Sequence, residues 1–372
     1  MYQVYQTPLA GTNVGVVFGS FAPLHQGHLD AIMRAKKEND GGCIVVVCGF
    51  NGDKGESVNL PMKRRYRYVR ELFSDDDLIA VCGINDTEIG IDKYPNGWNG
   101  WMKEFRQIAK QFIPNFENTH LRWYVGDEIY AKDLIAMGED AILLDRQENP
   151  ICATMIRNNP IKHWDKISEP FKRVFSTNIL IVGTASEGKT TLVRDLGKYF
   201  NAPYSHEWAR DYMKESCVTD CELDGTDYLA FLEGQYNLNK SLINSPANHG
   251  IFFSDTDAMV TRMYAEYYAQ DESCALTPAE FEKVASAADE YIRKSEWNKI
   301  FLIAPHGVFV DDHERYMKHS DMTSRNELYE ILCNNIKASG DWDKTTVLRG
   351  NYYENFVAIR DFVNEVIING QN

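Results

Sequence analysis

The chain has no excess of basic residues. Its 372 residues include 39 Lys and Arg against 54 Asp and Glu, which gives a formal net charge of −15. Nucleic acids and anionic membranes bind basic protein surfaces, so we expect neither as a partner. Anionic substrates must therefore bind where positive charge gathers locally.

The chain also lacks the cysteine spacing of metal sites and the hydrophobic runs of membrane proteins. None of its eight cysteines forms a C-x-x-C pair, and no histidine cluster completes a zinc pattern. We therefore expect reduced thiols in a cytoplasmic protein. No apolar run is long enough to cross a bilayer, and residues 1–11 contain no apolar signal segment.

Apolar runs alternate with helical patterns along the first half of the chain. The pattern predicts strands at 14–18, 43–48, 78–82, 121–125 and 141–144, and helices at 29–37, 61–73 and 98–112. Nearly continuous apolar strands separated by helices are typical of a parallel sheet covered on both faces. The first half is therefore predicted to be an open α/β domain.

Proline and polar residues interrupt this pattern between about 158 and 176. A new series follows, with strands predicted at 178–182, 251–253 and 300–303 and helices at 257–269 and 278–294. The interruption predicts two domains, 1–170 and 176–372.

A first phosphate-binding motif directly follows the first strand. Residues 19–28 read GSFAPLHQGH. Gly19 lets the backbone approach a phosphate closely, and the free amides at the next helix start attract anions. His25 and His28 are three residues apart on one turn, so both imidazoles can donate hydrogen bonds to one phosphate. A histidine pair that only caps the helix is the alternative.

This motif resembles the G-x-F-x-P-x-H-x-G-H signature of the nucleotidylyltransferase superfamily. Residues 151–157, ICATMIR, resemble its second signature, I-S-x-T-x-I-R, with Cys152 in place of the usual serine. The resemblance implies that Arg157 clamps the β- and γ-phosphates of ATP. The implied ATP site consists of Gly19, Phe21, His25, His28, Thr154 and Arg157.

Further segments resemble the bifunctional nicotinamide-mononucleotide (NMN) adenylyltransferase/ribosylnicotinamide kinase family. They are residues 94–101 (YPNGWNGW), 126–130 (GDEIY) and 144–146 (LDR). The resemblance implies that Trp98 and Asp127 bind the nicotinamide nucleotide, and a tryptophan face favours its cationic ring. In the basic run 63–67, Arg67 either meets the mononucleotide phosphate or belongs to a solvated helix face.

A second phosphate motif lies in the other half of the chain. Residues 183–190 read GTASEGKT between an apolar strand and a helical pattern, which is the context of a P-loop. In such a loop Lys189 reaches the β- and γ-phosphates, and Thr190 binds Mg²⁺. The predicted ATP contacts are Gly183, Ser186, Glu187, Gly188, Lys189, Thr190 and Thr191.

Acidic residues follow the next strand of this half. Asp255 is predicted to complete the Mg²⁺ site, and Asp257 is predicted to face the nucleoside. Glu207 and Arg210 resemble the E-x-x-R segment of the family's kinase half. That resemblance implies that both bind the acceptor, with Glu207 either accepting the proton of its hydroxyl or binding its ribose. A simple surface pair at i,i+3 is the alternative.

Residues 304–315 resemble the lid of the family, whose usual form is P-W-V-D-D-G-x-R. Arg315 is then implied to bind the γ-phosphate of ATP. Phe309 replaces the tryptophan of this pattern, and His313 replaces its glycine. Only 13 residues precede the first predicted strand, so we do not expect the N-terminal DNA-binding domain of some family members.

Together these motifs predict two α/β domains, a Rossmann-like nucleotidylyltransferase sheet followed by a P-loop kinase sheet. The resemblance implies phosphorylation of ribosylnicotinamide to NMN, then adenylyl transfer from ATP to NMN that gives NAD and pyrophosphate. The implied ligands are ATP with Mg²⁺, NMN, ribosylnicotinamide and NAD, and homo-oligomerisation stays open. Two alternatives are a nicotinamide-nucleotide sensor with weak or absent kinase turnover and a sulfate-activating adenylyltransferase/kinase pair.

Overall fold

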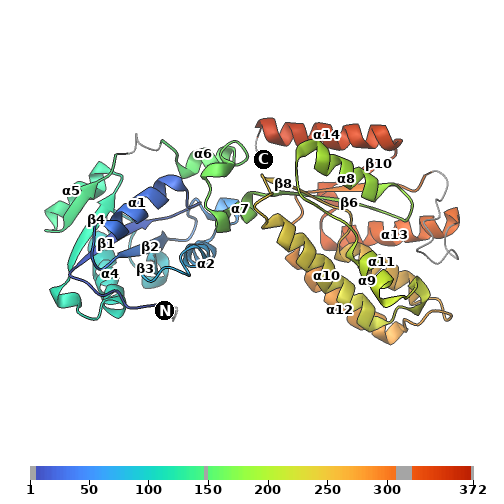
Figure 1. Ribbon diagram of the computed structural model, residues 1–372, viewed down its shortest axis with the longest axis horizontal. Helices are drawn as coiled ribbons and strands as arrows, with labels where there is room; N and C mark the ends of the chain where they lie inside the picture. The colour runs from blue at the N-terminus through green and yellow to red at the C-terminus, as the bar shows by residue number, and fades with distance from the viewer. Residues whose placement is uncertain (1–5, 146–149, 307–320, 370–372) are drawn as a thin grey trace. The chain divides into compact units, whose positions relative to one another are not determined.

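The computed structural model describes residues 6–145, 150–306 and 321–369. The chain divides into two compact units, Met1–Phe175 and Ser176–Asn372, which are described separately below (Figure 1). No helix within the described ranges is long and apolar enough to cross a membrane.

The first unit alternates strands and helices along its whole length. Its elements are β1 (Asn13–Gly19), α1 (Gln26–Lys37), β2 (Cys43–Gly49), η1 (Glu56–Val58), α2 (Met62–Leu72), β3 (Ile79–Asn85), α3 (Asp86–Ile89), α4 (Trp98–Phe112), η2 (Phe116–Asn118), β4 (His120–Val125), α5 (Glu128–Ala136), β5 (Asp140–Leu143), α6 (Ala153–Asn158), η3 (Trp164–Lys166) and α7 (Glu169–Phe175).

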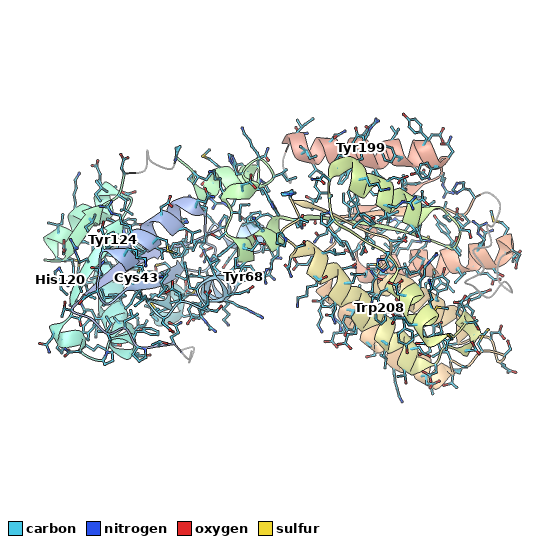
Figure 2. All side chains as sticks on the ribbon, viewed as in Figure 1. Cys43, Tyr68, His120, Tyr124, Tyr199 and Trp208 are labelled. Carbon is cyan, nitrogen blue, oxygen red and sulfur yellow. A yellow bond between two sulfur atoms is a disulfide. The ribbon has the colours of Figure 1, made fainter. Side chains whose placement is uncertain are left out.

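Across residues 6–145 the strands form a parallel sheet of five in the order β3-β2-β1-β4-β5. The central strands are buried on both faces, and Cys43 at the start of β2 is fully buried (Figure 2). Two apolar clusters pack on opposite faces of β1 and β2 because alternate residues of a strand point to opposite sides. Because the strands are parallel, all their carboxyl ends lie at one edge of the sheet, where ligands of such folds bind.

The second unit repeats this architecture. Its elements are β6 (Thr177–Gly183), α8 (Lys189–Phe200), β7 (Tyr204–Ser205), α9 (Trp208–Ser216), η4 (Asp220–Glu222), α10 (Gly225–Ile243), β8 (Ile251–Ser254), α11 (Ala258–Tyr268), α12 (Pro278–Lys294), β9 (Lys299–Ile303), α13 (Met322–Ser339), η6 (Trp342–Lys344), β10 (Thr345–Leu348) and α14 (Tyr352–Asn369). Over the described part of this unit the parallel strands have the order β10-β9-β6-β8-β7.

The predicted fold class, two α/β domains with parallel sheets, is confirmed. Helices α4 and α12 have the predicted bounds. The strands β7 and β10 were not predicted, because β7 has two residues and β10 opens with two threonines on a half-buried edge. Short, half-polar segments carry too little apolar pattern to be recognised as strands.

The prediction of reduced thiols is wrong for Cys221 and Cys274, which form a disulfide. Cys221 lies in η4 and Cys274 in the turn after α11, and 53 residues separate them. The amide of Ala275 donates to the carbonyl of Cys221 at 2.8 Å, which holds the two segments together. Only tertiary packing creates this proximity, so no local spacing in the sequence could reveal it.

Candidate functional site

The two histidines of the first motif lie where β1 leads into α1. His25 is the N-cap of α1 and is 5% exposed. Its ring stacks on that of His28, with centroids 3.7 Å apart. The backbone N–H of His25 donates to Nδ1 of His28 at 3.4 Å, so a neutral His28 carries its proton on Nε2. The pair thus places a hydrogen-bond donor at a helix start, which itself attracts anions.

A pocket of about 710 Å³ opens beside this histidine pair. Residues that follow β1, β2 and β4 contribute to its walls, at the carboxyl edge of the sheet. The predicted site residues that line it are Gly19, His25, His28, Trp98 and Asp127. Phe21 is buried instead, and its ring meets the ring of His28 edge-on at 5.0 Å. Phe21 therefore positions the histidine rather than forming the pocket wall.

Aromatic rings form one wall of this pocket. Trp98 stacks on Trp101 at 5.3 Å and also contacts Tyr94 and Tyr130. The Nε1 of Trp98 is buried, and no hydrogen-bond partner for it lies among the described residues. Trp101 packs on Phe105 in the core and is 5% exposed, so its main role is packing. Trp98 therefore contributes an aromatic ring to the wall of the pocket.

Arg157 of the second signature bonds to the first motif. Its Nη1 donates to the carbonyl of Ala22 at 2.5 Å, and its Nη2 donates to Oγ1 of Thr154 at 2.9 Å. Partial burial lowers the pKa of Arg157. Cys152 lines the pocket, whereas Arg157 and Thr154 lie outside its lining. The structure therefore brings Arg157 to the loop between Gly19 and His25, and a phosphate clamp requires its guanidinium to turn.

The basic run on α2 divides between solvent and core. Arg67 is exposed and lies outside the pocket lining. Arg65 is fully buried and pairs with Asp53, which lines the pocket. Sequence reasoning missed Arg65. The signal was its spacing, because residue 65 follows Met62 by three positions and so shares the inward face of the helix.

Burial keeps His25 neutral at physiological pH. Desolvation lowers the pKa of His25 to about 4. The ordinary pKa of histidine is near 6.5, so the unfolded chain binds more protons than the folded chain between about pH 4 and 6.5. The resulting stability is fully present above the unfolded pKa and is lost as pH falls through this window.

We expect the free energy of unfolding of the first unit to fall by up to about 3 kcal/mol between pH 7 and pH 4 because of His25. Hydrogen-exchange protection factors for β1 and β2, corrected for intrinsic rates, measure this change. His25→Asn should flatten the dependence, whereas His163→Asn should leave it unchanged. An equal pH dependence in His25→Asn and the wild type would contradict this prediction.

The P-loop joins β6 to α8 in the second unit. Gly188, the N-cap of α8, has φ of +74°, a conformation that favours glycine. The Nζ of Lys189 donates to the carbonyl of Thr184 at 2.7 Å, so the lysine folds back over the loop. The other predicted ATP contacts lie in the loop or in the first turn of α8: Gly183, Ser186, Glu187, Thr190 and Thr191.

Asp255 lies beside the P-loop at the end of β8. Oγ1 of Thr190 donates to Oδ2 of Asp255 at 2.5 Å. Asp255 is 1% exposed, and burial raises its pKa. Its Oδ1 is buried with no hydrogen-bond partner among the described residues. Two oxygen donors and one unused carboxylate oxygen fit a hard cation such as Mg²⁺, which takes its remaining ligands from phosphates and water.

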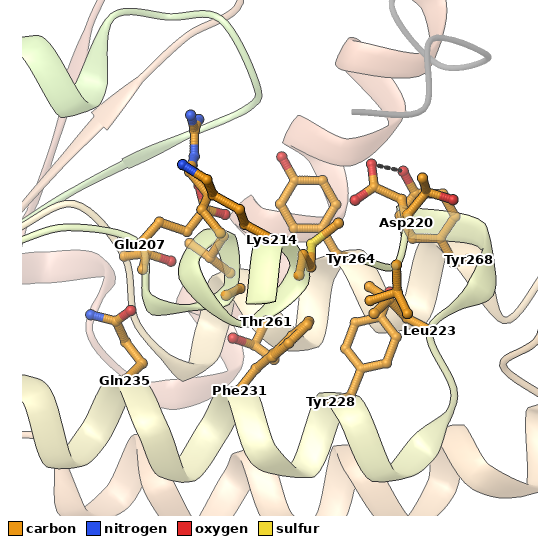
Figure 3. Close-up of a pocket in the computed structure, with 17 residues that line it drawn as sticks. Glu207, Lys214, Asp220, Leu223, Tyr228, Phe231, Gln235, Thr261, Tyr264 and Tyr268 are labelled. Atoms are coloured by element: carbon orange, nitrogen blue, oxygen red, sulfur yellow. Dashed lines mark hydrogen bonds and ion pairs between the residues drawn. The ribbon is translucent and has the colours of Figure 1, made fainter. Parts of the chain in front are cut away.

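A second pocket, of about 370 Å³, has Thr256, the residue after Asp255, in its lining together with residues of α9, α10 and α11 (Figure 3). Tyr228 and Phe231 project into it from α10, and Tyr264 and Tyr268 come from α11 (Figure 3). The hydroxyl of Tyr268 donates to Asp220 at 3.2 Å. Such aromatic walls suit a flat ring, and the charged and polar side chains of the same lining suit the hydroxyl groups attached to it. Sequence reasoning missed these rings because two separate helices, α10 and α11, bring them together.

Glu207 and Arg210 form an ion pair in the wall of this pocket. The Nε of Arg210 donates to Glu207 at 2.8 Å, and both side chains line the pocket. Both also influence the pKa of Asp255 by their charges, Glu207 raising it and Arg210 lowering it. The predicted i,i+3 pair therefore exists, and it lines this pocket.

The structure does not bring Asp257 to this pocket. Its Oδ1 accepts the amide of Met259 at 2.9 Å as the N-cap of α11, and its Oδ2 accepts Nε1 of Trp297 at 2.9 Å. Burial raises the pKa of Asp257 to about 6. Both carboxylate oxygens serve the packing of α11, which the sequence pattern alone did not reveal. The predicted lid residue Arg315, with Phe309 and His313, lies outside the described residues.

The two units match two known families of domains. A cytidylyltransferase-like model matches residues 16–159, and an AAA domain model matches residues 178–354. Among curated proteins, the trifunctional NAD biosynthesis/regulator protein NadR of Salmonella typhimurium is 29% identical over 275 residues. The match covers 70% of this chain and 64% of the length of that relative.

Solved structures extend the similarity to nearly the whole chain. A NadR protein in complex with NR is 34% identical with a TM-score of 0.85, and the match covers 99% of both chains. A NadR protein in complex with NAD and AMP-PNP is 34% identical with a TM-score of 0.83, covering 96% of this chain and 98% of that one.

Fold and site together define a nucleotidylyltransferase-like unit joined to a P-loop unit. The similarity in sequence and fold extends across both units. The chain belongs to the NadR family.

Proposed function

We propose that this chain carries out two consecutive steps of NAD synthesis. The second unit phosphorylates ribosylnicotinamide with ATP to give NMN, and the first unit joins NMN to AMP to give NAD. The observation that carries this proposal is that each unit places a phosphate-binding helix start next to an aromatic pocket at the carboxyl edge of its sheet. The bound NR, NAD and AMP-PNP of the related NadR structures support it.

In the first unit, the phosphate of NMN attacks the α-phosphorus of ATP, and pyrophosphate leaves. No protein nucleophile is needed, because the attacking oxygen belongs to the substrate. His25 and His28 donate hydrogen bonds to phosphate oxygens that gain charge in the transition state. Arg157 leaves the carbonyl of Ala22 and holds the departing phosphates. Trp98 and Asp127 hold the nicotinamide nucleotide.

In the second unit, the 5′-hydroxyl of ribosylnicotinamide attacks the γ-phosphorus of ATP, and ADP leaves. Glu207 accepts the hydroxyl proton, and Arg210 holds Glu207 in place. Lys189 leaves the carbonyl of Thr184 and stabilises charge on the transferred phosphate. Thr190 and Asp255 would hold Mg²⁺, which would neutralise phosphate charge.

The two reactions form a sequence, since the NMN made in one unit is the substrate of the other. Both reactions consume ATP, which the cytoplasm supplies, so we place the enzyme there. ATP, NMN, ribosylnicotinamide and NAD are its proposed small-molecule partners.

Incubation of the purified chain with ATP, Mg²⁺ and ribosylnicotinamide tests this proposal. Chromatography should show NMN first and then NAD, with one ADP and one pyrophosphate formed for each NAD. Binding of ribosylnicotinamide without any product would instead indicate a sensor. Pyrophosphate release that depends on sulfate and not on NMN would indicate a sulfate-activating enzyme.

A further inference from the structure

The P-loop contains a glutamate whose side chain is fully buried. Glu187 occupies the position before Gly188 in the loop. Its carboxylate forms an ion pair with Arg325 and lies 2.8 Å from Nδ1 of His306. It also accepts the backbone N–H of His306 at 3.3 Å and the hydroxyl of Thr184 at 3.3 Å. Glu187 thus contacts protein groups through both carboxylate oxygens.

Arg325 reaches this carboxylate from a distant part of the sequence. It lies in the first turns of α13, and its side chain is 2% exposed. Besides its pair with Glu187, its Nη2 donates to the carbonyl of His306 at 3.2 Å. The guanidinium therefore joins the phosphate loop to the segment that follows β9. It lies outside the lining of the 370 Å³ pocket that contains Glu207 and Arg210, called the acceptor pocket below.

A carboxylate in a phosphate-binding loop repels the ligand of that loop unless its charge is compensated. Removal of one partner of a buried ion pair is strongly destabilising, whereas replacement of both partners is close to neutral. The contacts also form a chain, because Thr184 binds Glu187 through its hydroxyl and Lys189 through its carbonyl. The charge compensation of Glu187 therefore affects Thr184, whose carbonyl accepts a hydrogen bond from Lys189, the lysine that reaches the phosphates.

We propose that Arg325 is a positioning residue for ATP in the kinase unit. Arg325 neutralises Glu187 and thereby fixes the P-loop. This inference rests on the proposed kinase function and deepens it. We expect Arg325 to act on the nucleotide site, because its side chain contacts the P-loop and lies outside the lining of the acceptor pocket. The pair is a tertiary feature, since 138 residues separate its members.

Steady-state assays of ADP release with ribosylnicotinamide test this proposal, because adenylyl transfer releases pyrophosphate instead. Arg325→Met should raise the KM for ATP about tenfold or more, since an uncompensated Glu187 remains. The KM for ribosylnicotinamide and the formation of NAD from NMN should stay unchanged. The double variant Glu187→Gln/Arg325→Met should return the KM for ATP to within about threefold of the wild type. Arg325→Lys, which keeps the positive charge, should raise the KM for ATP less than Arg325→Met does.

The matched control is Arg262→Met, which breaks the Arg262–Asp289 pair between α11 and α12 in the same unit. It should leave the KM for ATP unchanged. An unchanged KM for ATP in Arg325→Met, or an equal rise in the KM of both substrates, would overturn the inference. If Arg325→Met does not fold, the double variant Glu187→Gln/Arg325→Met is compared with Glu187→Gln alone. A KM for ATP of the double variant far above that of Glu187→Gln would overturn the inference. A wild type that releases no ADP would refute the proposed kinase instead.

Discussion

Lys189→Met is expected to lower kcat/KM for ribosylnicotinamide phosphorylation by about 100- to 1,000-fold, because it removes a preorganised positive donor from the transferred phosphate. The side chain lies over the loop, with Nζ 2.7 Å from the carbonyl of Thr184. Methionine keeps an unbranched side chain of similar size and removes the charged hydrogen-bond donor. Release of ADP in the presence of ribosylnicotinamide measures the effect.

The same preparation contains its own control for folding. NAD formation from NMN and ATP belongs to the first unit and should remain at the wild-type rate. Lys198→Met, a change of an exposed lysine on the same helix α8, should leave both activities intact. If Lys189→Met kept its kinase activity within a few-fold of the wild type, the P-loop would not be the phosphoryl-transfer site.

His28→Ala should produce the reverse pattern. Loss of its donor beside the α-phosphate is expected to lower NAD formation by about 100-fold or more, while phosphorylation of ribosylnicotinamide continues. The change also removes the ring on which the buried His25 stacks, so we expect the hydrogen bonds of both histidines to phosphate to be lost. Pyrophosphate release with NMN as substrate measures the loss.

The matched control is His120→Asn. His120 begins β4 at the amino end of the sheet and pairs with Asp140, at the opposite edge from His28. This variant should form NAD at the wild-type rate. Intact adenylyl transfer in His28→Ala would show that the histidine pair only caps the helix. An equal loss of both activities would point to global unfolding.

The fold was largely predictable because most of its strands contain apolar runs. Runs such as residues 43–48 are buried on both faces of a parallel sheet and need no alternation to be recognised. The helices α13 and α14 were not predicted. The weak amphipathic pattern of α13 follows from its burial of polar groups such as Arg325 and Asn335 beside apolar ones. Buried polar groups conceal the inward face of a helix in the sequence.

The candidate site was predictable where chemistry is local. The first motif spans residues 19–28 and the P-loop spans residues 183–190, so each motif is a short local segment. The structure places both motifs at carboxyl edges of sheets. Asp257 shows the limit of such reasoning, because a carboxylate just after a strand serves equally well as a helix cap. Which role it takes depends on Trp297, 40 residues away.

By itself, the sequence determined the two α/β units and the two phosphate-binding motifs, because backbone turns and helix starts depend on neighbouring residues. Only the tertiary structure decided which side chains share a pocket, which arginine of α2 is buried, and that Cys221 meets Cys274. It also decided that Glu187, predicted as an ATP contact, has its carboxylate engaged by Arg325. The physical reason is that burial and charge compensation depend on contacts between segments far apart in the chain, which no local pattern records.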